Sequence, residues 1–144
     1  YTMMGDTVNL AARLESSAKQ YGVYNFVGEN IYEVAKTHFA FRFLDFVQVK
    51  GKNIPVKVYE LVSDKNEILS ENIDLIKLFE QGIDHYFKQE WKMAINKFKK
   101  SENLEDKFES RNTTPSQIYI ERCQMFMENP PEKDWDGVWK MTSK

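Results

Sequence analysis

The segment TMMGDTVNLAARLE, from Thr2 to Glu15, carries the side chains best suited to chemistry. Asn9 and Arg13 are four residues apart, so on a helix they project from one face, one turn apart. An arginine fork stabilises charge that builds on a phosphate, and an asparagine orients a ribose. The first turns of a helix also favour phosphate. The spacing indicates phosphoryl chemistry. The alternative is an N-capped surface helix without a site, on which Arg13 pairs with an acidic side chain.

Metal-binding chemistry is not indicated by the sequence itself. Asp6 follows Gly5 at the predicted start of the helix, where an aspartate serves as the N-cap. His38 and His85 are the only histidines, and neither has a cysteine or second histidine at metal-ligand spacing. We therefore predict structural roles for both histidines and no metal ligand in this sequence.

The elements that must position Asn9 and Arg13 follow from hydrophobic periodicity. The predicted elements are a helix from Asp6 to Tyr21 ended by Gly22, a strand from Val23 to Val27, a short helix from Glu29 to Thr37, and a hairpin with strands Phe39 to Val49 and Val56 to Leu61. The apolar alternation changes near Asp45, which predicts a bulge or a change of burial there.

The second half of the chain is predicted to be helical. The composition turns polar and the alternation ends after Ser63, so we predict two domains, 1–62 and 72–144, joined by a linker at 63–71. The predicted helices run from about Asn72 to Lys88, from Glu90, and from Pro115 to the stop at Pro130, with Thr114 as N-cap of the last. Trp135 and Trp139 in the tail are large enough to dock on this bundle.

Composition excludes several classes of protein. The chain has 144 residues, 42% of them hydrophobic, and a net charge of -2, so it presents no overall field for nucleic acid or an anionic membrane. The single cysteine, Cys123, fits a reducing cytosol. No apolar run is long enough to span a bilayer. Because Tyr1 begins inside a predicted strand, we interpret the chain as a fragment of a cytoplasmic protein whose parent could carry a membrane anchor.

The motif YTMMGDTVNLAARLE resembles the signature of class III adenylate and guanylate cyclases of the bacterial type. The resemblance continues in order through VGENIYEVA to FVQVKGKNIPVKVYEL and covers about the first 62 residues. It implies an α+β fold: part of a ferredoxin-like cyclase domain, with a helix and an antiparallel hairpin, before the all-helical segment.

The resemblance also implies roles for four residues. Asn9 would position the ribose, and Arg13 would stabilise the pentacoordinate phosphorus as the 3′-oxygen displaces pyrophosphate. Lys50 would contact the triphosphate, with Lys52 as a second candidate, although both also fit a solvated hairpin. Thr2 stands where such enzymes select the base, and its hydroxyl can accept from the adenine amino group, which favours ATP over GTP. A threonine placed there for strand propensity is the alternative.

The intact enzyme would need parts that the resemblance places before Tyr1. These are the two aspartates that hold Mg²⁺ or Mn²⁺, a lysine that pairs with adenine, and the central strands of the sheet. Two-metal phosphoryl transfer requires placed cations, so we expect the fragment alone to be inactive. The implied enzyme is a homodimeric adenylate cyclase that makes 3′,5′-cyclic AMP for signal transduction, with one subunit supplying metals and the other Asn9, Arg13 and Lys50.

The helical segment has a pattern of its own. Small and aromatic residues from Gly82 to Ser101 are spaced as in a tetratricopeptide repeat, where small residues lie at a helix crossing. One repeat and part of another are present, whereas about three form an independent stack. The segment could bind a protein partner. The alternative function is therefore a non-catalytic interaction module that carries a degenerate cyclase remnant.

Overall fold

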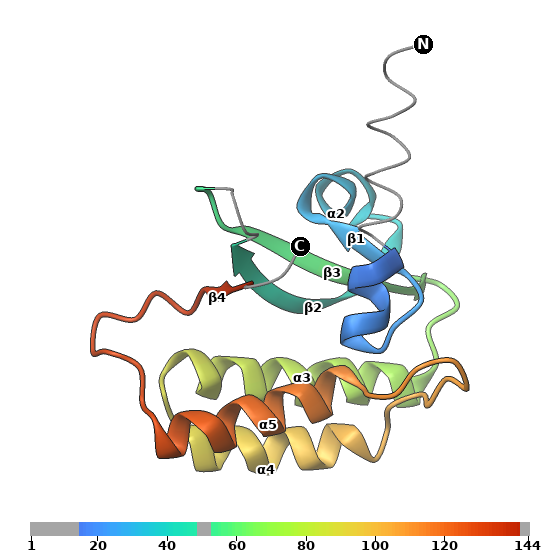
Figure 1. Cartoon of the computed structure of the whole chain (residues 1–144). Helices are drawn as coiled ribbons and strands as arrows, with labels where there is room; N and C mark the ends of the chain where they lie inside the picture. The colour runs from blue at the N-terminus through green and yellow to red at the C-terminus, as the bar shows by residue number, and fades with distance from the viewer. Residues whose placement is uncertain (1–14, 49–52, 142–144) are drawn as a thin grey trace.

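The computed structural model describes residues 15–48 and 53–141, which form a mixed sheet and five helical segments (Figure 1). Residues 15–21 are helical, and the other elements are β1 (Phe26–Gly28), α2 (Glu29–Ala35), β2 (Phe39–Gln48), β3 (Val56–Asp64), α3 (Ser70–Phe87), α4 (Trp91–Glu102), α5 (Pro115–Glu128) and β4 (Trp139–Lys140). The predicted α+β class is confirmed. The ferredoxin-like and repeat-like descriptions stay predictions.

The sheet has the strand order β1-β3-β2-β4. β3 pairs antiparallel with both β1 and β2, whereas the tail strand β4 pairs parallel with the end of β2. Helices α3, α4 and α5 form a layer on one side of the sheet, and α2 lies on the other (Figure 1). None of the helices in the described ranges combines the length and apolarity needed to cross a membrane.

The predicted irregularity at Asp45 is a β-bulge. Phe43 lies opposite Tyr59 and Asp45 opposite Val58, so Leu44 between them has no partner on β3. Leu44 and Asp45 are both buried, because the extra residue turns the strand so that neighbouring side chains are covered together. The bulge therefore carries a carboxylate into the interior.

The strand predicted from Val23 to Val27 begins later in the structure than in the prediction. β1 starts at Phe26, three residues after Val23. The Val23 carbonyl accepts a hydrogen bond from Arg111 Nε at 2.9 Å, and the Tyr24 ring packs on Phe108. These residues are held by the loop before α5, which withdraws them from the sheet.

Within the described residues, the predicted helix boundaries are confirmed to within about two residues, and the predicted start at Asp6 lies outside them. The Thr114 hydroxyl accepts from the Gln117 N–H at 3.1 Å, which makes it the N-cap of α5 with Pro115 at the first position. Gly82 lies where α3 crosses α4, and a Cβ there would meet the Phe98 ring at 2.7 Å. A small residue is thus required at this crossing, as predicted.

Two apolar clusters fill the interior. One lies among the three helices and contains Phe79, Ile83, Tyr86, Ala94, Phe98, Tyr119, Ile120 and Cys123. The other joins the 15–21 helix to the sheet and contains Ala18, Tyr21, Val23, Leu44, Val47 and Val58. Trp135 packs on the first cluster, so its predicted docking on the bundle is confirmed. Trp139 is part of β4 and packs on the second cluster, and it reaches the bundle at the Phe126 ring.

Candidate functional site

The predicted site residues Thr2, Asn9, Arg13 and Lys50 lie outside the described residues, as does Lys52. The structure describes the elements that follow or precede them in the chain. The described helical residues 15–21 start two positions after Arg13, and β2 ends at Gln48, two positions before Lys50. The structure therefore describes the elements next to these predicted residues in the chain, and the site itself stays a prediction.

The C-terminal end of the 15–21 helix is firmly anchored. Ala18 and Tyr21 are buried against the sheet in the cluster that contains Leu44. The helix ends at Gly22, whose φ of +76° favours glycine. A Cβ at Gly22 would meet the Thr113 carbonyl oxygen at 2.0 Å, so the backbone passes directly against the loop before α5.

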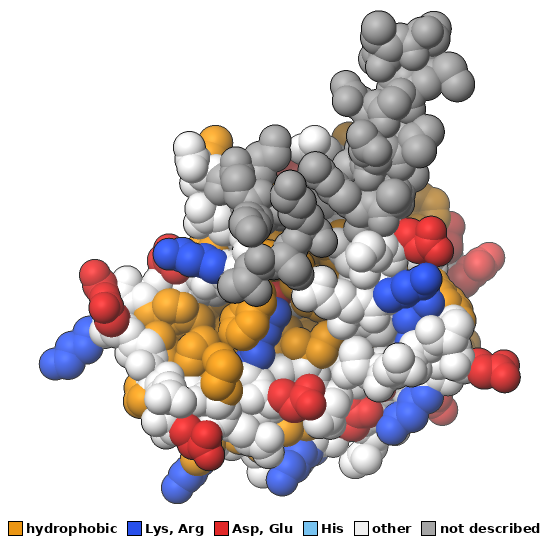
Figure 2. Space-filling model, viewed as in Figure 1, with side chains coloured by type: hydrophobic (Ala, Val, Ile, Leu, Met, Phe, Trp, Pro, Cys, Tyr) orange, Lys and Arg blue, Asp and Glu red, His pale blue; other side chains and the backbone are white. Residues whose placement is uncertain are grey.

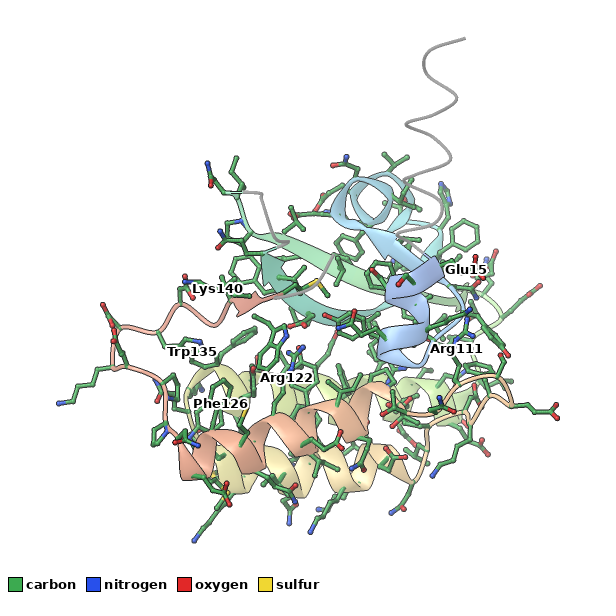
Figure 3. All side chains as sticks on the ribbon, viewed as in Figure 1. Glu15, Arg111, Arg122, Phe126, Trp135 and Lys140 are labelled. Carbon is green, nitrogen blue, oxygen red and sulfur yellow. The ribbon has the colours of Figure 1, made fainter. Side chains whose placement is uncertain are left out.

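The loop before α5 also contacts the residues that follow the 15–21 helix. Arg111 donates to the Val23 carbonyl and lies over the Tyr24 ring, with its guanidinium carbon 4.3 Å from the ring centroid. The Tyr24 hydroxyl shares a hydrogen bond with Ser110 Oγ at 2.5 Å. Figure 3 shows Arg111 near this end of the helix. The turn at 22–24 is thereby fixed by residues almost ninety positions later.

A buried carboxylate, Asp45, lies at the centre of the second anchoring point. Arg122 from α5 donates to both of its oxygens, Nη1 to Oδ1 at 3.0 Å and Nη2 to Oδ2 at 2.7 Å. The Tyr21 hydroxyl donates to Oδ2 at 2.5 Å and the Tyr119 hydroxyl to Oδ1 at 2.9 Å. The Phe46 N–H also donates to Oδ1. Three segments of the chain therefore meet at one charge.

Aromatic contacts complete the surroundings of Arg122. Its guanidinium carbon lies 3.9 Å from the centroid of the Trp139 ring, so the tail strand covers the ion pair. The Tyr119 hydroxyl also reaches the Leu44 carbonyl at 2.7 Å, beside the bulge. Figure 3 shows Arg122 between α5 and the sheet. A guanidinium that donates two hydrogen bonds to one carboxylate, and whose face is covered by an aromatic ring, is held in one geometry.

A separate network joins the sheet to the helices. Arg42 donates to Glu60 Oε1 through Nε at 2.8 Å and to Glu105 Oε2 through Nη1 at 2.7 Å. Glu105 Oε2 also accepts from the Ser116 N–H and hydroxyl. Burial raises the pKa of Glu60, whereas the two carboxylates raise that of Arg42 despite its own burial. We regard Arg42 as charged, because it faces two carboxylates.

Burial raises the pKa of the Tyr21 and Tyr119 phenols, and the Asp45 charge raises both further. Burial likewise raises the pKa of the Cys123 thiol to about 12. In an unfolded chain these groups titrate near 8.5 to 10. The folded state therefore keeps protons that the unfolded state releases, so the stability they contribute is complete below the unfolded values and is lost as the pH rises above them.

Alkaline pH should unfold this chain. Urea melts above about pH 9 are expected to show a falling free energy of unfolding, by up to about 1.4 kcal/mol per pH unit for each such group. Phenolate absorbance near 295 nm should appear together with loss of helical circular dichroism. The variant Tyr21→Phe should show a shallower slope above pH 10. An unfolding free energy that stays constant from pH 8 to 11 would contradict this.

Within 15–48 and 53–141, no group of three His, Cys, Asp or Glu side chains is placed to hold a metal ion. The described residues therefore do not fit a metal centre. His38 ends the segment after α2, and His85 pairs with Glu90 through Nδ1 at 2.8 Å. The metal ions implied by the resemblance are not assigned to any described side chain.

An open hollow of about 530 Å³ lies beside the tail. Apolar side chains gather on the same side of the molecule, over the tail and the neighbouring end of the bundle (Figure 2). The lining residues are Phe126, Glu132, Asp134, Trp135, Asp136, Val138, Trp139 and Lys140. Phe126 packs on both tryptophans, so the hollow borders the docked tail.

Sequence reasoning did not find the partners of Asp45 or Arg42. The available signal was a charged residue inside an otherwise apolar strand, because such a residue must pair if that face is buried. The strand FAFRFLDFVQ contains two such charges. The change of pattern at Asp45 predicts the bulge, but it does not predict the ion pair with Arg122.

Three adenylate cyclases resemble this chain. It is 30% identical over 128 residues to "Adenylate cyclase, terminal-differentiation specific" of Dictyostelium discoideum, a match that covers 85% of this chain and 6% of that protein. It is 39% identical over 62 residues to adenylate cyclase 1 of Rhizobium meliloti, covering 43% of this chain and 9% of the relative. It is 36% identical over 63 residues to an adenylate cyclase of Anabaena cylindrica, covering 42% and 12%. No family model and no solved structure matches the chain.

These similarities support a relationship to adenylate cyclases, and the chain spans 6% to 12% of the length of these curated relatives. The Dictyostelium match also reaches the helical segment. A continuous stretch of 85% omits about 22 of 144 residues, so it includes residues 23–122 wherever it begins. The similarity therefore extends over the sheet strands β1 to β3 and over α3 and α4.

Proposed function

We propose that this chain is part of an adenylate cyclase that converts ATP to 3′,5′-cyclic AMP and pyrophosphate. The observation that carries the proposal is the similarity to the Dictyostelium cyclase over 85% of the chain. The motif from Thr2 to Glu15 adds support, because it contains an amide and a guanidinium at one-turn spacing.

In the proposed reaction the ribose 3′-oxygen bonds to the α-phosphorus as the bond to pyrophosphate breaks. Asn9 orients the ribose so that the 3′-oxygen lies in line with the leaving group. Arg13 donates hydrogen bonds to the phosphate oxygens, whose charge distribution changes most in the transition state. Lys50 binds the triphosphate, and Thr2 accepts from the adenine amino group.

The proposed site is shared between two subunits of a homodimer. In this proposal one subunit supplies the aspartates that hold Mg²⁺ or Mn²⁺, and the other supplies Asn9, Arg13 and Lys50, as the resemblance to class III cyclases implies. The geometry that supports the proposal is the anchoring of the 15–21 helix at Tyr21 and Gly22. A helix fixed at this end can hold an arginine that comes shortly before it in the sequence.

The test is an assay of the full-length protein with ATP and with GTP, followed by the variant Thr2→Val. We expect cyclic AMP from the unaltered protein and a several-fold to hundredfold smaller preference for ATP in the variant. One polar contact to a base contributes about 1 to 3 kcal/mol of discrimination. Absence of cyclic nucleotide from the unaltered, folded protein would contradict the proposed activity, and an unchanged preference would contradict the role of Thr2.

A further inference from the structure

We infer that α5 and the loop before it are a positioning part of the nucleotide site, acting through Tyr21 and Arg122. The inference rests on the proposed function, since it concerns how that site is held. It assigns the helical segment a task in catalysis in place of a separate docking role. Tyr21 and Arg122 are positioning residues, because they act through Asp45 and the 15–21 helix.

The first link is the Asp45 carboxylate. It accepts from Tyr21 at the end of the 15–21 helix and from Arg122 on α5, so α5 and the helix are joined through one buried group. Asp45 is 1% exposed and Arg122 is 6% exposed. Water therefore cannot readily replace either partner, and movement of α5 leaves a buried charge without its counter-ion.

The second link lies at the turn after the helix. Gly22 approaches the Thr113 backbone too closely for any side chain, and Arg111 holds the Val23 carbonyl. This link does not involve Asp45. The end of the helix is thus held at two independent points, both supplied by the chain between α4 and the middle of α5.

Two fixed points restrict both the axial position and the tilt of a helix. A displacement of about 1 Å at a reacting group can reduce turnover about a hundredfold, even when its cause lies far from the chemistry. Arg13 precedes the described helix by two residues. The sequence predicts Arg13 on the same helix, so in the proposed site its placement depends on how the described residues 15–21 are held.

The chain contains a matched control. Arg42, Glu60 and Glu105 also form a buried ionic network between the sheet and the helical segment. The side-chain hydrogen bonds of this network reach Ser116 on α5, and none of them reaches a residue from 15 to 24. Weakening this network should lower stability without displacing the 15–21 helix.

The experiment compares Tyr21→Phe, Arg122→Lys and the control Glu60→Gln in the full-length protein, because Glu60 pairs with Arg42 within the sheet and lies outside α5 and the loop before it. We expect kcat for cyclic AMP formation to fall about 3- to 10-fold in Tyr21→Phe and about 10- to 100-fold in Arg122→Lys, with KM for ATP changed less than threefold. Glu60→Gln should keep kcat per folded molecule while its melting temperature falls. Unchanged kcat in both test variants, or an equal loss in the control, would overturn the inference.

Amide hydrogen exchange on the 144-residue chain tests the linkage without cyclase activity. Exchange at residues 15–21 should be at least about fivefold faster in Tyr21→Phe and Arg122→Lys than in the unaltered chain, and unchanged in Glu60→Gln. Equal exchange in all four proteins would show that α5 does not hold the helix. If the unaltered full-length protein makes no cyclic AMP while exchange changes as expected, the proposed function fails and the structural linkage stands.

Discussion

Replacing Arg13 with Ala in the full-length protein should lower kcat for cyclic AMP formation by at least about a hundredfold. The KM for ATP should change much less. A guanidinium that stabilises charge only in the transition state contributes to kcat and little to ground-state binding. Steady-state kinetics at saturating and limiting ATP separate the two effects.

The conservative variant Arg13→Lys sharpens this test. Lysine keeps the charge but loses the planar fork, so we expect turnover between that of the unaltered protein and that of Arg13→Ala. Circular dichroism and melting temperature should be unchanged in both variants. A parallel loss of ATP binding and turnover would show that Arg13 binds the ground state, and full activity in Arg13→Ala would remove it from the site.

The largest expected effect on stability follows from the variant Arg122→Met. The change leaves the buried Asp45 without its counter-ion, and breaking such a pair on one side typically costs about 3 to 5 kcal/mol. Urea denaturation of the 144-residue chain should report this loss.

The double variant Asp45→Asn with Arg122→Met is the appropriate control. It removes both charges and keeps an oxygen that can accept from Tyr21 or Tyr119. We expect it to be more stable than Arg122→Met alone by about 1 to 3 kcal/mol, because no ion remains unpaired. Additive losses from the two changes would mean that the pair does not interact.

Local chemistry made several elements predictable. Thr114 followed by Pro115 is typical of a helix start, and Gly22 of a helix end, and both signals depend on nearby backbone groups. The structure confirms both. The bulge at Asp45 was predictable for the same reason, since a break in alternation is visible within a few residues.

Long-range pairing was not predictable from these patterns. Arg122 lies 77 positions after Asp45, and the local sequence around either residue does not predict that they pair. The strand β4 has two residues, which is too short for a periodic pattern, and its parallel pairing depends on where α5 ends. The predicted site of Thr2, Asn9, Arg13 and Lys50 came from a motif and stays a prediction, because the described residues do not include it.

The pairing of β4 with β2 has a consequence for synthesis on the ribosome. Val47 pairs with Trp139 and Gln48 with Lys140, so this pairing of β2 cannot form until the tail has been made. At about 5 to 20 residues per second, the intervening segment takes roughly 5 to 20 seconds to emerge. The counter-ion of Asp45, Arg122, is made 77 residues later, after nearly the same delay. The nascent hairpin must keep this carboxylate in water meanwhile, so the described sheet and its buried ion pair can close only after α5 and β4 have been made.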